Sequence, residues 1–538
     1  VGAVTDGRCT GETRVSGGGL AGMVAAVERV RAGRQVVLVD RDTPERIGGL
    51  ARWAFGGMAL VGTPLQAKLG IADTAEVALA DWLSFGELGA DEYWPRQWAE
   101  YYVRHSKVEV YDWLRGLGLR FMPAVNWVER GMQGEGNSLP RYHVLWGTSL
   151  RMVEVLAERL RVEGAGRLTL LHRHYITQLN QQDGRVSGAT GIDENDGSAV
   201  NITAEQIIVA TGGLNGTLEN VRKHWDSAQM PLPAELLNGA TPLADGKLHE
   251  LLEEQGATIT HQGCMWNYAA GIPHPHPHFP GHGLSLIPCK SALWLNHRGE
   301  RIGPQPLVTG FDTHELCRRV AQQEKPYTWQ LMNWRIAAKE LAVSGAEHNP
   351  NIRDRKLFAF AREMLLGNHR LVQQLVDESP QVIAADTLEE LAARMNALTG
   401  SADVDVATLQ ATVDAFDANF ARRGSLMNDD QLRRIQHARQ WSSDRLRTCK
   451  PAPLRKRGSG PFIAMQVRLI SRKSLGGIVT DLQGRVLNGA GEPLPGLYAI
   501  GEASGFGGGG ANGKRSLEGT FLAGCILTAR ATARALLS

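Results

Sequence analysis

A run of glycines near the start of the chain leads into a helical pattern and then into a short apolar strand. The stretch GGGLAGMVAAVERVRAGRQVVLVD predicts a turn, a helix over Leu20–Arg31 that stops at Gly33, and a strand over Val36–Val39. A turn, a helix and a strand in this order form half of a doubly wound parallel sheet. The sequence therefore predicts an α/β protein.

The glycines have the spacing of a dinucleotide-binding turn, Gly17-x-Gly19-x-x-Gly22. In such a turn the glycines permit a sharp bend, close approach of the backbone to a pyrophosphate, and close packing of helix on strand. The free N–H groups at the helix start favour the phosphate charge. Asp40 ends the following strand, where a carboxylate can accept hydrogen bonds from ribose hydroxyls.

The segment before this turn does not have the expected composition. A buried parallel strand is normally an apolar run, but Cys9–Ser16 reads CTGETRVS. Glu12 and Arg14 inside a sheet would each carry a desolvation cost of several kcal/mol, on the order of that for an unpaired buried polar group. Either this segment is not the expected strand, or the first sixteen residues differ from the sequence that ordinarily leads into such a turn.

Two later strands also end in small residues or glycine. The apolar run 207–209 continues as Ala-Thr-Gly-Gly, a form that lets a dinucleotide lie against the backbone. The run 497–500 ends in Gly501-Glu502, where a carboxylate can bind ribityl hydroxyls. The glycines of 505–510 then lead to the start of the last helix, whose positive end can stabilise negative charge on a flavin ring near N1 and O2. In this order, the stretches indicate a flavin.

At this point the sequence resembles the FAD-binding family that joins fumarate reductase flavoproteins to 3-ketosteroid dehydrogenases, and more narrowly its FAD-binding dehydrogenases. The resemblance runs from about Gly17 to the C terminus. It is carried by the stretches GGLARWAFGG, PRYHVLWGT, IIVATGG, ADGKLHELLEEQGA, RKSLGGIVTD and GLYAIGEASG.

The resemblance implies a Rossmann-like FAD-binding domain with an inserted β-meander, and a separate α+β cap domain for the substrate. It implies FAD held noncovalently, because GGLARWAFGG lacks the histidine to which membrane-bound relatives attach their flavin. The expected cofactor contacts are Gly17, Gly19, Leu20, Ala21, Gly22, Asp40, Arg41, Gly48, Gly49, Gly56, Gly57, Ala210, Thr211, Gly212, Gly213, Asp245, Gly501, Glu502, Ser516, Leu517 and Thr520.

The departures from the family concern the substrate. Where fumarate reductases have a pattern like His-Thr-Met-Gly-Gly, this chain has Lys473-Ser474-Leu475-Gly476-Gly477. Their arginine after Gly-Ala-Asn is matched by Arg515, with a two-residue insertion. The tyrosine that ketosteroid dehydrogenases carry in the glycine-rich tail has no counterpart after Gly501. Neither substrate carries over directly.

The resemblance implies hydride exchange between flavin N5 and a carbon beside or conjugated to a carbonyl, which interconverts C–C and C=C. A cation is needed to hold enolate charge. The candidates for this role are Arg515, then Arg472 and Lys473. The candidates for proton transfer are Tyr142, His143 and His314, and for each histidine the alternative is a hydrogen-bonded structural role.

The chain is too long for one core. We expect an FAD-binding domain in two pieces, residues 1–260 and 456–538, around a cap over 261–455. The meander is predicted from RLTLLHRH, ITQLNQQDGRVSGATGI with a turn at Asp183-Gly184, and EQIIVATGG. Within the cap, helices are expected near 312–323, 331–343 and 388–398. A last helix over 517–537 is expected in the C-terminal piece of the FAD-binding domain.

Composition limits the partners. Lys and Arg number 58 against 56 Asp and Glu, so no strong field attracts nucleic acid or an anionic membrane. No apolar run approaches the roughly 20 residues of a membrane span, and the opening VGAVTDGRCTGETRVS lacks a signal-peptide pattern. The six cysteines are scattered, which favours buried thiols in a reducing compartment. We expect a cytoplasmic protein with a small-molecule substrate and an electron acceptor that the sequence does not identify, and a homo-oligomer is left open.

The histidine-rich stretch HPHPHFPGH resembles a metal cluster in composition only. Alternating prolines favour extended backbone, which directs successive imidazoles outward in different directions. We therefore assign no metal site here. The alternative, a metal bound by His274, His276, His278 and His282, is left open.

Three functions remain open. The first is an FAD dehydrogenase acting on a ketone or enone, including steroid-like ones. The second is a fumarate-reductase-like enzyme that reduces a short unsaturated acid, suggested by Arg515. The third is a non-catalytic flavin-binding partner subunit, suggested by the polar segment before Gly17.

Overall fold

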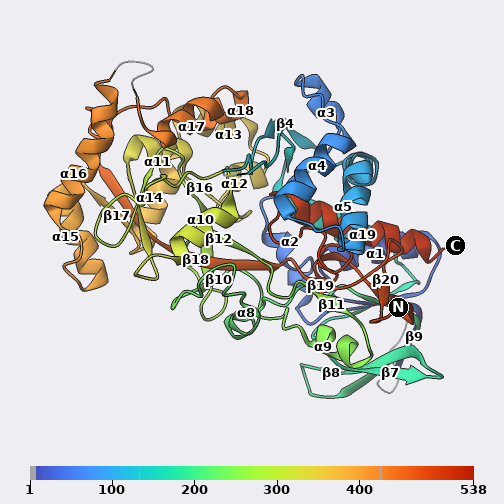
Figure 1. Ribbon diagram of the computed structural model, residues 1–538. Helices are drawn as coiled ribbons and strands as arrows, with labels where there is room; N and C mark the ends of the chain where they lie inside the picture. Colours follow the sequence, from blue (N-terminus) through green and yellow to red (C-terminus); the bar gives the residue numbers. More distant parts are fainter. Residues whose placement is uncertain (1–7, 133, 423–426, 538) are drawn as a thin grey trace. The chain divides into compact units, whose positions relative to one another are not determined.

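The computed structural model describes residues 8–132, 134–422 and 427–537. The chain divides into two compact units (Figure 1). The first unit comprises Val1–Trp225, Ala240–Trp266 and Arg472–Ser538, and the second comprises Asp226–Gly239 and Asn267–Ser471. Residues 1–7 of the polar opening segment lie outside the described part of the chain.

The first unit is built on a mixed sheet whose central strands are parallel. Its order is β20-β21-β9-β1-β2-β6, with parallel pairing from β21 to β6 and an antiparallel edge at β20. These strands are β1 (Arg8–Ser16), β2 (Val36–Val39), β6 (Leu168–Leu171), β9 (Ala199–Val209), β20 (Arg485–Leu487) and β21 (Pro493–Ala499). Together with α1 (Leu20–Arg31), which joins β1 to β2, this confirms the predicted Rossmann-like fold class.

A β-meander extends from this sheet. Strands β7 (His174–Gln182) and β8 (Arg185–Asp193) pair antiparallel, and β8 continues onto the first half of β9. The turn between β7 and β8 is formed by Asp183 and Gly184, both with positive φ (53° and 73°). The long strand β9 thus belongs to the meander over its first half and to the parallel sheet over its second half.

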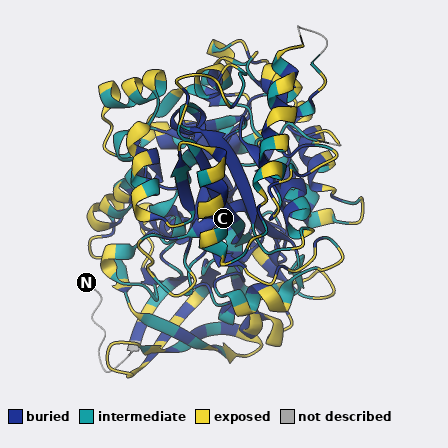
Figure 2. Ribbon diagram, turned by 90° about the vertical axis from the view of Figure 1, so that its left-hand side faces the viewer, coloured by how far each residue is buried: buried dark blue, intermediate teal, exposed yellow. Residues whose placement is uncertain are grey.

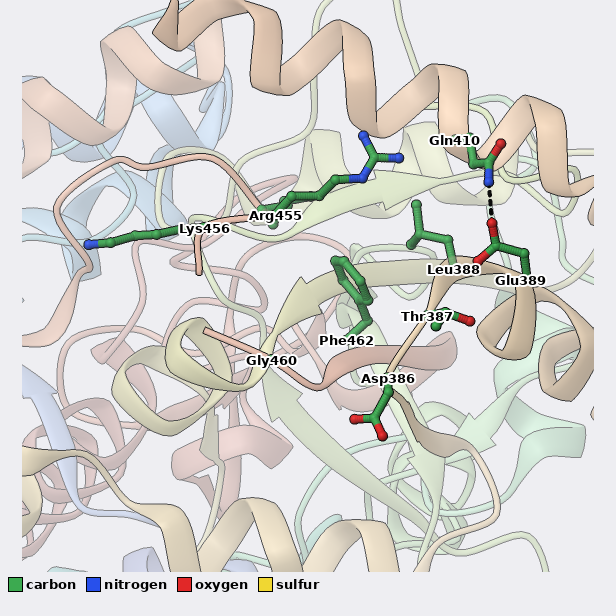
Figure 3. A pocket seen from close by; sticks show the side chains of 10 residues that line it. Asp386, Thr387, Leu388, Glu389, Gln410, Arg455, Lys456, Gly460 and Phe462 are labelled. Atoms are coloured by element: carbon green, nitrogen blue, oxygen red, sulfur yellow. Dashed lines mark hydrogen bonds between the residues drawn. The ribbon is translucent and has the colours of Figure 1, made fainter. Parts of the chain in front are cut away.

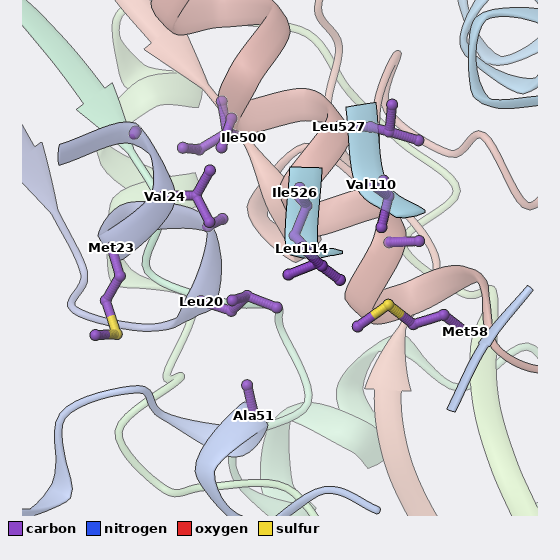
Figure 4. Close-up of a cluster of buried hydrophobic side chains, with 14 of the residues drawn as sticks. Leu20, Met23, Val24, Ala51, Met58, Val110, Leu114, Ile500, Ile526 and Leu527 are labelled. Carbon is purple, nitrogen blue, oxygen red and sulfur yellow. The ribbon is translucent and has the colours of Figure 1, made fainter. Parts of the chain in front are cut away.

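Helices cover the sheet and bury a large apolar core. Helix α1 packs against α7 (Thr148–Glu163) and α19 (Thr520–Ala535). Figure 4 shows Leu20 and Val24 of α1 directed toward Ile526 of α19. In Figure 2 the sheet strands are mostly buried, whereas outward faces of the helices are exposed. The first and last helices of the chain therefore share one core.

The first unit contains further helices and short strands. A π-helical turn, η2, separates the helices α5 and α6. The helices are η1 (Pro44–Arg46), α2 (Leu50–Trp53), α3 (Pro64–Lys68), α4 (Ala75–Gly86), α5 (Tyr93–His105), η2 (Ser106–Asp112), α6 (Trp113–Gly116), α8 (Leu218–His224), α9 (Lys247–Glu254) and η5 (Gly501–Ala503). The strands are β3 (Gly57–Ala59), β4 (Phe121–Asn126), β5 (Tyr142–Leu145), β11 (Ile259–Thr260) and β19 (Gly477–Ile478).

The polar segment before the glycine turn is a central strand of the sheet. β1 pairs in parallel with β2 on one side and β9 on the other. Arg14 lies opposite Val37 and Ile207, and its side chain is fully buried. No hydrogen-bond partner for its guanidinium is found among the described residues. Backbone pairing thus forms the strand in spite of its side chains, and the segment is the expected strand with an unexpected residue in it.

The second unit has its own sheet, with the order β14-β15-β18-β12-β13-β16 and with β10 and β17 also pairing with β18. The strands are β10 (Leu237–Asn238), β12 (Met265–Pro273), β13 (Gly283–Ile287), β14 (Leu293–Leu295), β15 (Thr328–Asn333), β16 (Ala342–Val343), β17 (Val382–Ala385) and β18 (Phe462–Ser474). The helices are α10 (Thr313–Ala321), α11 (Trp334–Glu340), α12 (Pro350–Arg353), α13 (Leu357–Leu366), α14 (His369–Glu378), α15 (Leu388–Thr399), α16 (Val406–Asp417), η3 (Ala418–Phe420), α17 (Asp430–Ala438) and α18 (Ser442–Arg447).

The second unit differs in two ways from what the sequence predicts. The chain returns to the first unit at Arg472 and not at residue 456, because β18 is a central strand of the second sheet. The helix expected over 331–343 begins as a strand, since β15 pairs with β14 and β18 through Asn333. The side chain of Asn333 then caps α11 by accepting a hydrogen bond from the Ile336 amide at 3.0 Å.

Each of the six cysteines is a free thiol, and only Cys525 is partly exposed. In the described ranges, no helix is both long enough and apolar enough to cross a bilayer.

Candidate functional site

The glycine turn joins β1 to α1 and has the geometry that its spacing predicts. Gly17 has a φ of +108°, and a Cβ there would collide with the carbonyl of Ala210, which directly follows β9. A Cβ on Gly22 would collide with the Gly17 carbonyl. A Cβ on Gly19, in contrast, would meet no atom within 4 Å. The fold therefore requires glycine at positions 17 and 22, whereas Gly19 borders open space at the start of α1.

A second pair of glycines lies beside this turn. The amide of Gly48 donates to the carbonyl of Gly18 at 2.9 Å, and Gly19 and Gly48 form a parallel bridge. A Cβ on Gly49 would lie 3.3 Å from the Cα of Gly19. The stretch GGLARWAFGG thus contributes backbone to the same place as the glycine turn.

Its other end, Gly56-Gly57, packs next to the strand β5. Gly56 has a φ of +97°, and a Cβ on Gly57 would overlap the phenol of Tyr142. The last residue of β3, Ala59, donates its amide to the Gly519 carbonyl at 2.8 Å. This places Gly57 and Tyr142 near the residue that precedes α19.

Acidic and basic side chains follow the end of β2. The carboxylate of Asp40 accepts the Gly18 amide and, at 2.7 Å, the Asp42 amide, and burial raises the pKa of Asp40. Each carboxylate oxygen can accept a further bond, so a ribose hydroxyl still fits there. Arg41 pairs with Asp245 at 2.9 Å and lies over the ring of Tyr175. The predicted contacts Arg41 and Asp245 are therefore brought together.

The two distant pieces of the first unit meet at the glycine turn. The amide of Ile500 donates to the Val209 carbonyl at 2.9 Å, which aligns the end of β21 with the turn 210–213. A Cβ on Gly501 would lie 2.8 Å from the Cβ of Ala21 on α1. The stretches near residues 17–22, 210–213 and 500–502 thus converge although they are far apart in sequence.

Glu502 is fixed by a neighbour that the sequence analysis did not single out. The carboxylate of Glu502 accepts the amide of Ser474 at 3.0 Å, and the Ser474 hydroxyl accepts the amide of Leu214 at 3.1 Å. Ser474 therefore links the turn after β9 to the acid after β21. Its position directly after Lys473 was the only sign of this role in the sequence.

The start of α19 carries a buried polar network. The hydroxyls of Ser516 and Thr520 lie 2.7 Å apart, and both donate to the side-chain oxygen of Asn512. The amide nitrogen of Asn512 is buried and has no partner among the described residues. A buried amide left without a partner indicates a group that the structure does not contain. Asn512 was quoted in the sequence but not predicted as a contact.

The geometry fits a dinucleotide with a ring system. Helices α1 and α19 both begin at a glycine without a side-chain cap, so their first N–H groups are available to negative charge. Gly19 leaves room for phosphates, and Asn512 offers an unused donor. These residues would hold FAD through backbone amides at one end and through the α19 network at the other.

Two charged side chains lie beside this network. The ammonium of Lys473 lies 4.5 Å from the ring centre of Phe521 on α19. Burial and the nearby Arg472 lower the pKa of Lys473 to about 8. Burial raises the pKa of Glu502 to about 7 against the opposing effect of Lys473. An ammonium in such an enclosed place can stabilise charge that develops on a carbonyl oxygen.

The other predicted catalytic residues differ in their surroundings. Both ring nitrogens of His143 are bonded, to Thr63 at 2.8 Å and to the Arg141 carbonyl at 2.7 Å. Burial lowers the pKa of His143 to about 4. This geometry fits the structural alternative for His143. His314 belongs to the second unit, in the first turn of α10.

Tyr142 and Arg515 are the remaining candidates. Tyr142 is partly exposed, and burial and the charge of Glu518 raise the pKa of its phenol. Arg515 forms an ion pair with Glu87 and lies over the Phe85 ring at the end of α4. The guanidinium fork of Arg515 is therefore engaged by a carboxylate of the protein.

A further group was missed by the sequence analysis. The ring of His261 bonds the carboxylate of Glu92, and His261 has a φ of +55°. Its Nδ1 is buried with no partner in the described part of the chain, and a Cβ on Gly510 would lie 2.7 Å from that atom. No spacing in the sequence connects Glu92 with His261, so only the fold could identify this pair.

The second unit contains a pocket between α15, α16 and the segment 454–462. Figure 3 shows its acidic and basic side chains, Asp386 and Lys456 among them, directed apart, with Gln410 bonded to Glu389. The side chains do not converge on one point, so this pocket offers no arrangement for chemistry.

Comparisons with known proteins identify the family. Residues 15–522 match the family model described as FAD binding domain. A KsdD-like steroid dehydrogenase of Mycobacterium tuberculosis is 40% identical over 544 residues, which cover 98% of this chain and 95% of that protein.

Solved structures share the fold. A 3-ketosteroid delta1-dehydrogenase from Sterolibacterium denitrificans has a TM-score of 0.70 at 16% identity, with 98% of this chain and 100% of that chain covered. A flavocytochrome c3 fumarate reductase has a TM-score of 0.69 at 20% identity, with 98% and 79% covered. The chain therefore belongs to this FAD-binding family and is an oxidoreductase with FAD as its cofactor.

Proposed function

We propose that this protein oxidises or reduces a C–C bond next to the carbonyl of a ketone or enone, with steroid-like compounds as the preferred class. The observation that carries the proposal is the ammonium of the partly buried Lys473, which lies over the ring of Phe521 at the start of α19. Two relatives that are 40% identical to this chain are named KsdD-like steroid dehydrogenases, and these names support this substrate class.

Bound FAD supplies a hydride acceptor or donor. The protein then has two tasks, which are to stabilise charge on the carbonyl oxygen and to transfer a proton at the adjacent carbon. Lys473, with Arg472 next to it in sequence, serves the first task. Tyr142 is the better candidate for the second, because His143 uses both ring nitrogens within the protein.

The fumarate-reductase-like alternative needs a cation that holds a substrate carboxylate. Arg515 was the residue that suggested this alternative. Its guanidinium forms an ion pair with the carboxylate of Glu87. The non-catalytic alternative was suggested by the polar segment before Gly17. That segment forms a strand that pairs with β9 and, over Thr13–Ser16, also with β2, which removes the reason for this alternative.

Anaerobic mixing of the purified protein with a panel of ketosteroids, simple enones and short carboxylic acids tests the proposal. We expect saturated ketosteroids to bleach the flavin absorption, and short acids to leave the oxidised and reduced spectra unchanged. A flavin that responds to none of the carbonyl compounds would exclude the reaction class. If only the acids react and Arg515→Lys removes that reaction, the alternative is correct.

Lys473→Met is expected to lower kcat for the ketone by about 100-fold or more, as does the loss of one donor from an oxyanion site. Lys473→Arg should restore part of the rate because it restores the charge. Lys514→Met is the matched control, since Lys514 is an exposed lysine of the same unit that pairs with Glu87. Steady-state kinetics at equal FAD content measures the effect, and equal rates for the two Met variants would contradict this role of Lys473.

We further propose a cytoplasmic protein, in agreement with its free thiols. The electron acceptor and self-association remain open to experiment.

A further inference from the structure

Three histidines of the proline-rich stretch come together in the second unit, contrary to the expectation that they diverge. His274 follows β12 and His282 precedes β13, and their rings stack with centroids 4.4 Å apart. The ring of His278 lies 5.2 Å from that of His282. One nitrogen from each of these rings lies within 4.8 Å of the others. The loop bends back on itself, so residues four apart converge, whereas His276 points outward and is exposed.

A fourth histidine approaches from another segment. His348 lies beyond β16, and its ring centroid is 5.7 Å from that of His274. His274, Glu347 and His348 form a second group whose ligand atoms lie within 4.8 Å of one another. His348 is only 5% exposed, and its Nε2 has no hydrogen-bond partner among the residues described. A buried nitrogen without a partner indicates a missing ligand.

We propose that these residues bind a divalent transition metal ion of the zinc class, with His274 and His348 as its central ligands. His274 is the residue that both groups share. His282, His278 and Glu347 are available to complete a tetrahedral site. Imidazole nitrogens with one carboxylate suit Zn²⁺, Ni²⁺ or Cu²⁺, whereas Ca²⁺ and Mg²⁺ require oxygen ligands.

Binding requires small movements of the rings. Zinc–nitrogen bonds are about 2.0–2.1 Å long, so ligand atoms up to 4.8 Å apart have to draw closer. The Nδ1 atoms of His274 and His282 accept the amides of His276 and His278, and a metal bound at either atom would replace that bond.

The site would connect two loops at one edge of the second sheet. His274 and His282 end the loop between β12 and β13, and His348 follows β16, which pairs with β13. A metal held by both loops would restrain them in the manner of a structural zinc site. The proposal does not depend on the flavin or on the reaction.

The experiment uses untagged full-length holoprotein treated with a chelator and titrated with ZnCl₂ in a calorimeter. We expect one equivalent to bind with a Kd of about 1 μM or lower, elemental analysis to find one zinc per chain, and Co²⁺ to give visible absorption bands. Binding should also raise the melting temperature. Failure to bind Zn²⁺, Ni²⁺ or Cu²⁺ at this affinity overturns the proposal.

Variants identify the ligands. His274→Ala and His348→Ala should each weaken zinc binding by more than the roughly 10–100-fold that the loss of a supporting partner costs. His276→Ala is the matched control, because it removes a histidine of the same loop that belongs to neither group. If the buried variants do not fold, His282→Ala replaces them, with FAD content as the check on folding. Equal affinity in the ligand variants and in His276→Ala overturns the assignment.

Discussion

Replacement of Arg14 by methionine is expected to stabilise the protein against unfolding by about 1–4 kcal/mol, the range seen when buried charged groups give way to well-packed apolar side chains. Arg14 is fully buried between Val37 and Ile207 on the neighbouring strands. Its guanidinium has no hydrogen-bond partner within the described ranges. Methionine has a similar length and no charge, so it should fill the space without a large cavity. Urea unfolding followed by tryptophan fluorescence at fixed FAD concentration measures the change.

Arg29→Met is the matched control, and it should have the opposite effect. Arg29 is as buried as Arg14, but it donates to the Thr13 hydroxyl at 2.9 Å, the Gln206 side chain at 2.8 Å and the Leu536 carbonyl at 2.9 Å. Its removal takes the arginine donor away from the Thr13 hydroxyl and the Leu536 carbonyl, whereas Gln206 still accepts the Thr13 hydroxyl. An acceptor left unsatisfied costs about 1–3 kcal/mol for a single buried group. Equal shifts of the urea midpoint in both variants would show that hydrogen-bond partners do not determine how a buried arginine affects the free energy of unfolding of this protein.

The pH dependence gives an independent check on Arg14. Burial lowers its pKa from 12.5 to about 9 in the folded protein. Between these two values the unfolded chain holds a proton that the folded chain has released, so the stability of the wild type rises with pH there. The advantage of Arg14→Met is therefore full at pH 7 and smaller at pH 10. An advantage that grows from pH 7 to pH 10 would contradict the buried charge as its cause.

The parts of the fold that could be predicted from the sequence depend on local periodicity and on glycine. Helix α1 and strand β2 have the predicted bounds, because apolar spacing and the stop at Gly33 are local signals. The turn at Asp183 and Gly184 was also predicted from local chemistry. The strand β1 could not be predicted with certainty, because its polar side chains conflict with a pairing that the neighbouring strands provide.

The rest required contacts between distant residues. Helical periodicity over 331–343 was misleading, because pairing with β18 makes the segment through Asn333 a strand. The role of Ser474 depends on Leu214 and Glu502, and the histidine group depends on a loop that turns back toward His348. The spacing of residues within a single sequence does not predict such long-range contacts. The glycines of the turn after β1 were easier to predict, since a backbone that bends sharply requires glycine at particular positions of the sequence.

Gly19→Val is expected to leave the protein folded but to weaken FAD binding by at least about 100-fold, or about 2.7 kcal/mol. Gly19 has a φ of −69°, which valine adopts without strain, and its Cβ would meet no protein atom within 4 Å. Added methyl groups would instead occupy the space at the uncapped start of α1, where the phosphates should lie against free amides. The ratio of flavin to protein absorbance after gel filtration, and titration of the apoprotein with FAD, measure the loss.

Gly116→Val is the matched control, because a Cβ there also meets no atom within 4 Å and the position lies at the end of α6 in the same unit. It should retain FAD, whereas Gly22→Val should fail to fold, since its Cβ would collide with the Gly17 carbonyl. Circular dichroism separates loss of fold from loss of cofactor. Wild-type FAD affinity in a folded Gly19→Val protein would mean that the pyrophosphate does not lie at this turn, and the assignment of the other cofactor contacts would then lose its starting point.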